Sequence, residues 1–224
     1  MLRDTLRTEE YFASYLCMQD KRIAQFSQKL DELNAQANAP AKILQCHHFL
    51  SGLLHDKIYA QYSYGSSLSI IRETVVHYLF HIQKEGRLSY QEAMDAISLS
   101  IVFHIPFPKI PRDCLPEDAL LFALLEHTQK ATFAFSDVAL MFPESSSAFL
   151  KALQGNLSST SLRQYIEKNW YTDNKDASWY DSHKSNRDIY CGYWCFVGAA
   201  VAILLQWDLH AFEGCPYFPI DVIL

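Results

Sequence analysis

Hydrophobic residues recur at three- and four-residue steps along most of this chain, the spacing that puts apolar side chains on one face of a helix. A first helix is expected over about residues 5–36, where the apolar face is formed by Leu16, Ile23, Phe26, Leu30 and Leu33. A second is expected over about residues 41–62, after Asn38-Ala-Pro40. No long stretch alternates apolar and polar residues as a half-buried strand does. The pattern therefore predicts an all-α fold.

Capping and helix-breaking residues separate the later helices. Gly65-Ser-Ser67 interrupts the pattern before a third helix that reaches about Glu85, and Ser89-Tyr-Gln-Glu92 matches a capping box that opens a fourth. Three prolines then fall within Ile105-Pro-Phe-Pro-Lys-Ile-Pro111, which favours an extended connector because proline cannot continue a helix. Pro116-Glu-Asp118 is typical of a helix N-terminus. Further helices are expected over about residues 130–140, 144–153, 159–171 and 190–206.

These elements sum to about nine or ten helices, which we expect to form a single bundle-like domain. Within it, residues 1–104 are an N-terminal helical half, residues 105–116 a proline-rich connector and residues 117–224 a C-terminal helical half. A chain of 224 residues is long enough to bury most of its apolar side chains in such a fold.

Charge is distributed unevenly along the chain. Residues 1–112 contain 12 Lys and Arg against 11 Asp and Glu, whereas residues 113–224 contain 7 against 14. An acidic half argues against nucleic acid or an anionic membrane as a direct partner and favours a basic protein surface. Solubility alone is the other explanation of the same asymmetry.

No sequence feature indicates export or insertion into a membrane. The N-terminal segment carries charges at Arg3, Asp4 and Arg7, where a signal peptide has an apolar core. The most apolar run, residues 191–205, is 15 residues long, shorter than the roughly 20 of a membrane-spanning helix. We therefore expect a cytoplasmic protein.

Cysteines and histidines form no complete catalytic or metal-binding pattern. The six cysteines are irregularly spaced and are expected to be reduced core residues. Glu73, His77 and His81 fall close to one face of the third helix, so a metal-dependent helical-bundle enzyme built on them is kept as an alternative function. A hydrolase using Asp181 with His183 has no glycine-rich loop to stabilise an oxyanion. We expect no catalytic residue, no cofactor and no metal.

The last third of the chain interleaves aromatic and acidic residues. It contains Asp176-Ala-Ser-Trp-Tyr-Asp-Ser-His-Lys184, then Tyr190-Cys-Gly-Tyr-Trp-Cys-Phe-Val-Gly-Ala-Ala200 and Gly214-Cys-Pro-Tyr-Phe-Pro-Ile-Asp221. Large rings beside carboxylates are typical of protein-binding hot spots, in which the acids pair with Lys or Arg of the partner. Packing onto the apolar helix is the alternative for the rings. The candidate partner-binding residues are Asp173, Asp176, Trp179, Tyr180, Asp181, His183, Asp188 and Glu213.

The order of these motifs resembles the C-terminal half of the PoNi family, bacterial immunity proteins that neutralise PoNe-type DNase toxins. Arg3-Asp-Thr-Leu-Arg-Thr-Glu-Glu-Tyr-Phe12, with Lys21-Arg-Ile23, resembles the N-terminal half of the same family. The resemblance implies an immunity protein whose partner is a cognate nuclease toxin domain, and not an enzyme. Family members usually carry a glutamate where this chain has Val197. A helical interaction module without a toxin remains an alternative, and self-association into a homodimer stays open.

Overall fold

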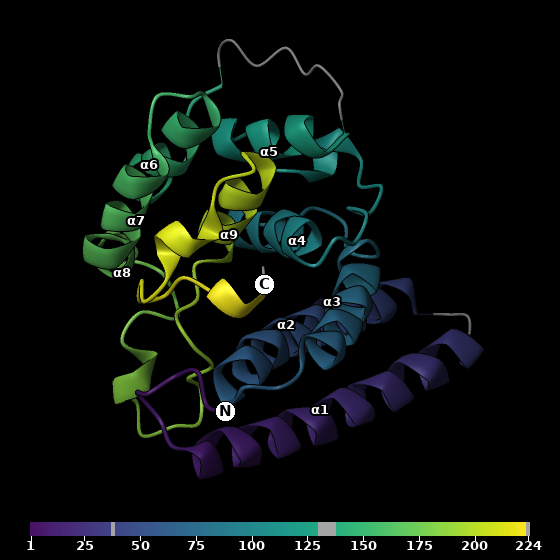
Figure 1. The fold of residues 1–224 in the computed structure, drawn as a ribbon. Coiled ribbons are helices and arrows are strands. Elements are labelled where there is room, and N and C mark those ends of the chain that lie inside the picture. Colours follow the sequence, from purple (N-terminus) through teal and green to yellow (C-terminus); the bar gives the residue numbers. More distant parts are fainter. Residues whose placement is uncertain (37–38, 130–137, 223–224) are drawn as a thin grey trace. The chain divides into compact units, whose positions relative to one another are not determined.

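The computed structural model describes residues 1–36, 39–129 and 138–222 (Figure 1). Across these residues there are nine α-helices and no strand, so the predicted all-α fold is confirmed. The helix expected over residues 130–140 falls mostly outside the described residues. Contacts divide the chain into two compact units: unit 1 contains Met1–Arg87, Pro108–Ile110 and Asp181–Gly192, and unit 2 contains Leu88–Phe107, Pro111–Tyr180 and Tyr193–Leu224. The expected grouping into one domain with a connector at residues 105–116 stays a prediction.

Unit 1 is built on three helices, α1 (Glu9–Gln36), α2 (Pro40–Tyr64) and α3 (Leu68–Ile82). The middle helix, α2, packs against both of the others (Figure 1). One apolar cluster between α1 and α2 joins the predicted face of the first helix to the second, and its members are Leu30, Leu33, Cys46 and Leu50, with Ile23, Phe26 and Ile43 packed against them. The apolar face of α1 therefore forms a helix–helix core, as its spacing predicts.

The first helix begins later than the sequence pattern predicts, at Glu9 instead of about residue 5. The preceding backbone is bonded elsewhere, because the N–H groups of Arg3 and Asp4 donate to the carbonyl oxygen of Ser63 at 2.9 and 3.2 Å. The Asp4 carboxylate also accepts the N–H of Leu6 at 2.8 Å. An aspartate that bonds its own neighbouring backbone competes with helix formation, which explains the late start.

Unit 2 surrounds the short helix α9 (Phe196–Leu204), which packs against α4 (Tyr90–Val102), α5 (Ala119–Gln129), α6 (Pro143–Leu153) and α7 (Ser159–Lys168). One-turn α8 (Trp170–Asp173) follows α7. Gly198 packs closely against its neighbours, because a Cβ there would lie 2.8 Å from Ile166 Cδ1 of α7 and 3.0 Å from Cys195 Sγ. Val197 is half-buried in the first turn of α9.

The predicted apolar helix over residues 190–206 is wrong in its first part, since α9 begins only at Phe196. The N–H of Tyr190 donates to the Tyr11 hydroxyl at 3.0 Å, and the N–H of Cys195 donates to the carbonyl oxygen of Tyr217 at 2.7 Å. Gly192 adopts a positive φ of 128°. These backbone groups bond to residues distant in sequence, so the segment is buried and apolar without being helical.

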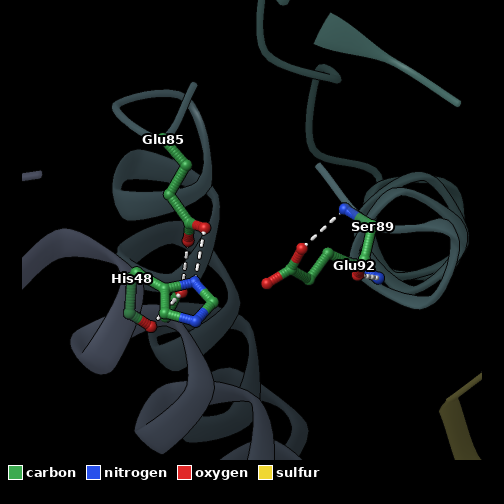
Figure 2. Close-up of polar contacts among 5 residues, drawn as sticks. His48, Glu85, Ser89 and Glu92 are labelled. Carbon is green, nitrogen blue, oxygen red and sulfur yellow. Dashed lines mark hydrogen bonds and ion pairs between the residues drawn. The ribbon is translucent and has the colours of Figure 1, made fainter. Parts of the chain in front are cut away.

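The predicted capping box at the start of α4 is confirmed. The Glu92 carboxylate accepts the N–H of Ser89 at 2.7 Å (Figure 2), and the Ser89 hydroxyl accepts the N–H of Glu92 at 3.3 Å. Two N–H groups that the helix leaves unbonded are thereby satisfied. No helix in the part of the chain that the structure describes combines the length and the apolar character needed to cross a bilayer.

Candidate functional site

The two segments that carry the family resemblance meet within unit 1. Arg7 Nη2 donates hydrogen bonds to the carbonyl oxygens of His183 and Ser185, at 2.6 and 3.0 Å. The Tyr11 hydroxyl donates to the carbonyl oxygen of Tyr190 at 2.9 Å and accepts that residue's N–H at 3.0 Å. Side chains from the start of the chain thus satisfy the irregular backbone of residues 183–190, and these motif residues hold the segment in place.

A buried carboxyl lies at the centre of this arrangement. Asp4 is 7% exposed and accepts a hydrogen bond from the hydroxyl of Tyr190, which is fully buried. Burial raises the pKa of Asp4, while the hydrogen bonds from Tyr190 and from the backbone of Leu6 act in the opposite direction. Asp4 and Tyr190 therefore form a buried polar contact whose two members depend on each other.

Three predicted partner-binding residues belong to unit 1 and differ in their surroundings. His183 is half-buried, with its ring edge-on to Tyr190 at 6.2 Å and its carbonyl oxygen bonded to Arg7. Asp181 has a positive φ of 57° and pairs with Lys184 Nζ at 2.9 Å. Asp188 is exposed. His183 thus has a structural role in unit 1, and Asp188 is the acid best placed at the surface.

The other predicted residues belong to unit 2, where Trp179 and Tyr180 join a cluster of rings. Trp179 lies 6.1 Å from Trp170 and 5.3 Å from Tyr193 between ring centroids. Tyr180 stacks on Tyr171 at 4.5 Å. Both rings therefore pack within unit 2, which is the alternative to partner binding that the sequence leaves open. Both nevertheless remain partly exposed, so packing leaves part of each ring at the surface.

The predicted partner-binding acids of unit 2 are all at least partly exposed. Asp176 is exposed and Asp173 is half-buried. Glu213 is exposed and pairs with His210 Nδ1 at 2.6 Å, and this hydrogen bond raises the pKa of the histidine. None of these carboxylates is buried as Asp4 is, so they form surface charge and not core contacts.

Two residues that the sequence did not single out complete the ring cluster. Tyr171 contacts both Tyr180 and Tyr217, and its ring is 5.9 Å from that of Tyr217 with only 15° between the planes. Tyr217 comes from the Pro216-Tyr-Phe-Pro219 tail. Its positive φ of 64° is a conformation that tyrosine seldom adopts, and nothing in the sequence indicates it.

The difference in net charge is larger between the two units than between the two halves of the sequence. Unit 1 contains 13 Lys and Arg against 11 Asp and Glu, whereas unit 2 contains 6 against 14. Neither lysine nor arginine occurs after Arg187. Unit 2 therefore carries the acidic character of the protein.

The residues of the alternative metal site do not come together. Glu73 and His77 are exposed on α3, and His81 is half-buried. Within the described ranges, no group of three metal-binding side chains with ligand atoms inside 4.8 Å of one another includes Glu73, His77 or His81. His81 Nδ1 instead lies 2.9 Å from His47 Nδ1 of α2, as a hydrogen bond between two rings.

A second polar contact of unit 1 joins α2 to the turn that follows α3. The Nδ1 of His48 lies 2.9 Å from the Glu85 carboxylate (Figure 2), and the Ser51 hydroxyl donates to the other oxygen of that carboxylate. The Glu85 carboxylate is nearly buried, whereas the His48 side chain is 61% exposed. Together with the His47–His81 contact, these groups form polar contacts between α2 and the end of α3 with its following turn.

The His47–His81 contact predicts that acid weakens the fold. Burial is the main cause that lowers the pKa of His81, to about 4, and burial also lowers that of His47. A lowered pKa means that the stabilisation is complete above about pH 6.5 and is lost as the pH falls towards 4. Because the His81 ring is partly exposed, we expect the loss to be about 1–2 kcal/mol of unfolding free energy.

The measurement is urea denaturation at several pH values across this window. His81→Gln removes the titrating ring and keeps a hydrogen-bonding group, so its stability should fall less than that of the wild-type protein between pH 6.5 and 4. His77→Gln removes an exposed ring from the same helix and is the matched control. An unchanged pH dependence in His81→Gln would contradict the assignment.

Comparison with protein families identifies the class. The two parts of the chain each match a family model of immunity proteins: residues 3–111 match the model described as PoNe immunity protein (PoNi), N-terminal, and residues 116–222 match PoNe immunity proteins (PoNi), C-terminal. The chain therefore belongs to the PoNi family of PoNe immunity proteins, and the resemblance of its motifs is confirmed. Neither the curated proteins nor the solved structures gave a match.

Proposed function

We propose that this chain binds a cognate bacterial DNase toxin in the cytoplasm and neutralises it, which protects the producing cell. Membership of an immunity-protein family supports immunity against a nuclease toxin as the general role. The proposal assigns the chain a binding role, with no catalytic residue, cofactor or metal. The toxin domain is its partner, and neither nucleic acid nor a membrane is bound directly.

The observation that carries the proposal beyond the family is the charge of unit 2. A nuclease holds DNA through basic side chains that neutralise phosphates. Unit 2, whose sequence contains 14 acidic against 6 basic residues, offers its exposed carboxylates to the same side chains, and so competes with DNA for them. Asp176 and Glu213 of unit 2 and Asp188 of unit 1 are the exposed acids among the candidates.

The function is tested with the nuclease domain encoded beside the gene for this chain. The purified domain digests plasmid DNA in the presence of increasing amounts of the chain. We expect DNA cleavage to stop near equimolar chain, with no effect on an unrelated DNase. Digestion at an undiminished rate with excess chain would contradict the proposed function.

Charge reversal tests which acids take part. The double variant Asp176→Lys with Asp188→Lys places like charges opposite a basic partner, so we expect about 10–100-fold weaker binding, equivalent to about 1.4–2.8 kcal/mol. The loss should come mainly from slower association and should be largest at low salt. Binding is measured by biolayer interferometry at two salt concentrations.

The matched control changes the net charge equally at other exposed acids of unit 2, by Asp113→Lys with Glu117→Lys. We expect this control to bind within about threefold of the wild-type protein, because exposed charges that do not touch the partner are screened. If both double variants lose affinity equally, the total charge determines binding. The assignment of Asp176 and Asp188 to the interface is then wrong.

A further inference from the structure

Three tyrosine rings of unit 2 form a stacked row. Tyr171 is the ring common to both contacts, with Tyr180 at 4.5 Å and 28° and Tyr217 at 5.9 Å and 15°. Each ring is partly exposed. The buried ring of Tyr193 backs the row, 5.1 Å from Tyr171, so this common ring is supported from within the unit.

The backbone holds the last ring of the row in an uncommon conformation. Tyr217 has a φ of 64°, in a region that costs a non-glycine residue about 1 kcal/mol or more. Its carbonyl oxygen accepts the N–H of Cys195 at 2.7 Å, and the next residue, Phe218, stacks on Phe212 at 4.2 Å. Packing and hydrogen bonding on both sides thus fix a strained residue whose ring remains partly at the surface.

Acidic groups accompany the rings. Asp173 ends α8 two residues after Tyr171, and exposed Asp176 precedes Tyr180 on the same segment, with one lysine between the two acids. The chain after Arg187, which supplies Tyr217, has no lysine or arginine. The segments that supply the rings therefore carry acidic as well as aromatic side chains.

We propose that this tyrosine row, Tyr180, Tyr171 and Tyr217, binds an arginine side chain of the nuclease partner. The inference rests on the proposed function and names the chemistry at its interface. A guanidinium is planar, so it stacks on a tyrosine face while its N–H groups reach a carboxylate such as that of Asp176. Nucleobases also stack on aromatic rings, but the charge of unit 2 repels their phosphates.

The test separates the π faces from apolar packing. Tyr180→Leu with Tyr217→Leu removes two faces and keeps apolar volume, whereas Tyr180→Phe with Tyr217→Phe keeps both faces. Binding to the nuclease domain encoded beside the gene is measured by isothermal titration calorimetry, and circular dichroism checks that both variants fold. We expect the Leu pair to bind about 10–100-fold more weakly and the Phe pair to stay within about threefold of wild type.

Other outcomes overturn the inference. Equal losses in the Leu and Phe pairs would show that the hydroxyl groups, and not the π faces, matter. Wild-type affinity in the Leu pair would show that the row lies outside the interface, while the proposed function stands. Binding of a single-stranded oligonucleotide that the Leu pair abolishes would make the row a nucleic-acid site. If the wild-type chain itself does not bind the nuclease domain, the proposed function fails, and the inference fails with it.

Discussion

Replacing Asp118 by alanine is expected to lower the free energy of unfolding by about 3–5 kcal/mol, because three N–H groups lose a charged acceptor. Asp118 is fully buried, and its Oδ1 accepts the N–H groups of Leu120 and Leu121 at 2.9 and 3.0 Å. Its Oδ2 accepts the N–H of Met141 at 2.8 Å. One carboxylate therefore caps α5 and ties that helix to the chain before α6.

Two further substitutions make this prediction specific. Asp118→Asn keeps an acceptor for α5 but turns an amide N–H towards that of Met141, so its cost should be intermediate, about 1–3 kcal/mol. Glu117→Ala removes the adjacent exposed acid and should cost less than about 0.5 kcal/mol. Guanidinium denaturation followed by circular dichroism measures all three. A cost of Asp118→Ala no greater than that of Glu117→Ala would refute the capping role.

Elements whose determinants are local could be predicted from the sequence. The Ser89–Glu92 capping box and the apolar face of α1 are set by residues three or four positions apart, and both are present as expected. The predicted start of α5 is also close to the observed one, because the acid that opens the helix lies at its N-cap. Spacing along the chain carries the whole of this information.

Features that depend on distant partners could not be predicted. Residues 190–195 have the composition of a buried helix, but the Tyr11 hydroxyl and the Tyr217 carbonyl oxygen take up the N–H groups of Tyr190 and Cys195. The same limitation applies to the candidate site. The acidic aromatic segment was treated as one surface, whereas its residues up to Tyr180 belong to unit 2 and those from Asp181 belong to unit 1.

The candidate residues therefore have different roles, which their amino-acid types alone did not indicate. His183 serves unit 1 through a backbone carbonyl group that accepts from Arg7, a role independent of the imidazole chemistry that drew attention to it. Tyr217 is not among the candidates, yet its partly exposed ring stacks on that of Tyr171. The motifs at both ends of the chain contribute to the fold of unit 1, and the exposed acids and rings of unit 2 are the groups that we propose for partner contact.

Loss of the Tyr190 side chain should be the most damaging change in unit 1. Its ring is fully buried, 6.1 Å from Phe12 and 6.2 Å from His183 between centroids, and its hydroxyl donates to Asp4. Tyr190→Ala leaves a cavity and a buried carboxyl without its donor, so we expect a loss of about 3–5 kcal/mol in unfolding free energy.

Conservative and neighbouring substitutions separate the two contributions to this loss. Tyr190→Phe keeps the ring and removes only the donor to Asp4, so it should cost about 1–3 kcal/mol. Ile189→Ala shortens the adjacent side chain, which is 50% exposed, and should cost less than about 0.5 kcal/mol. Chemical denaturation at pH 7 gives the three values. If Tyr190→Phe were as stable as wild type, the Asp4 contact would contribute nothing. If Tyr190→Ala matched Ile189→Ala, segment 183–190 would not depend on this ring, and Arg7 and Tyr11 alone would hold it in place.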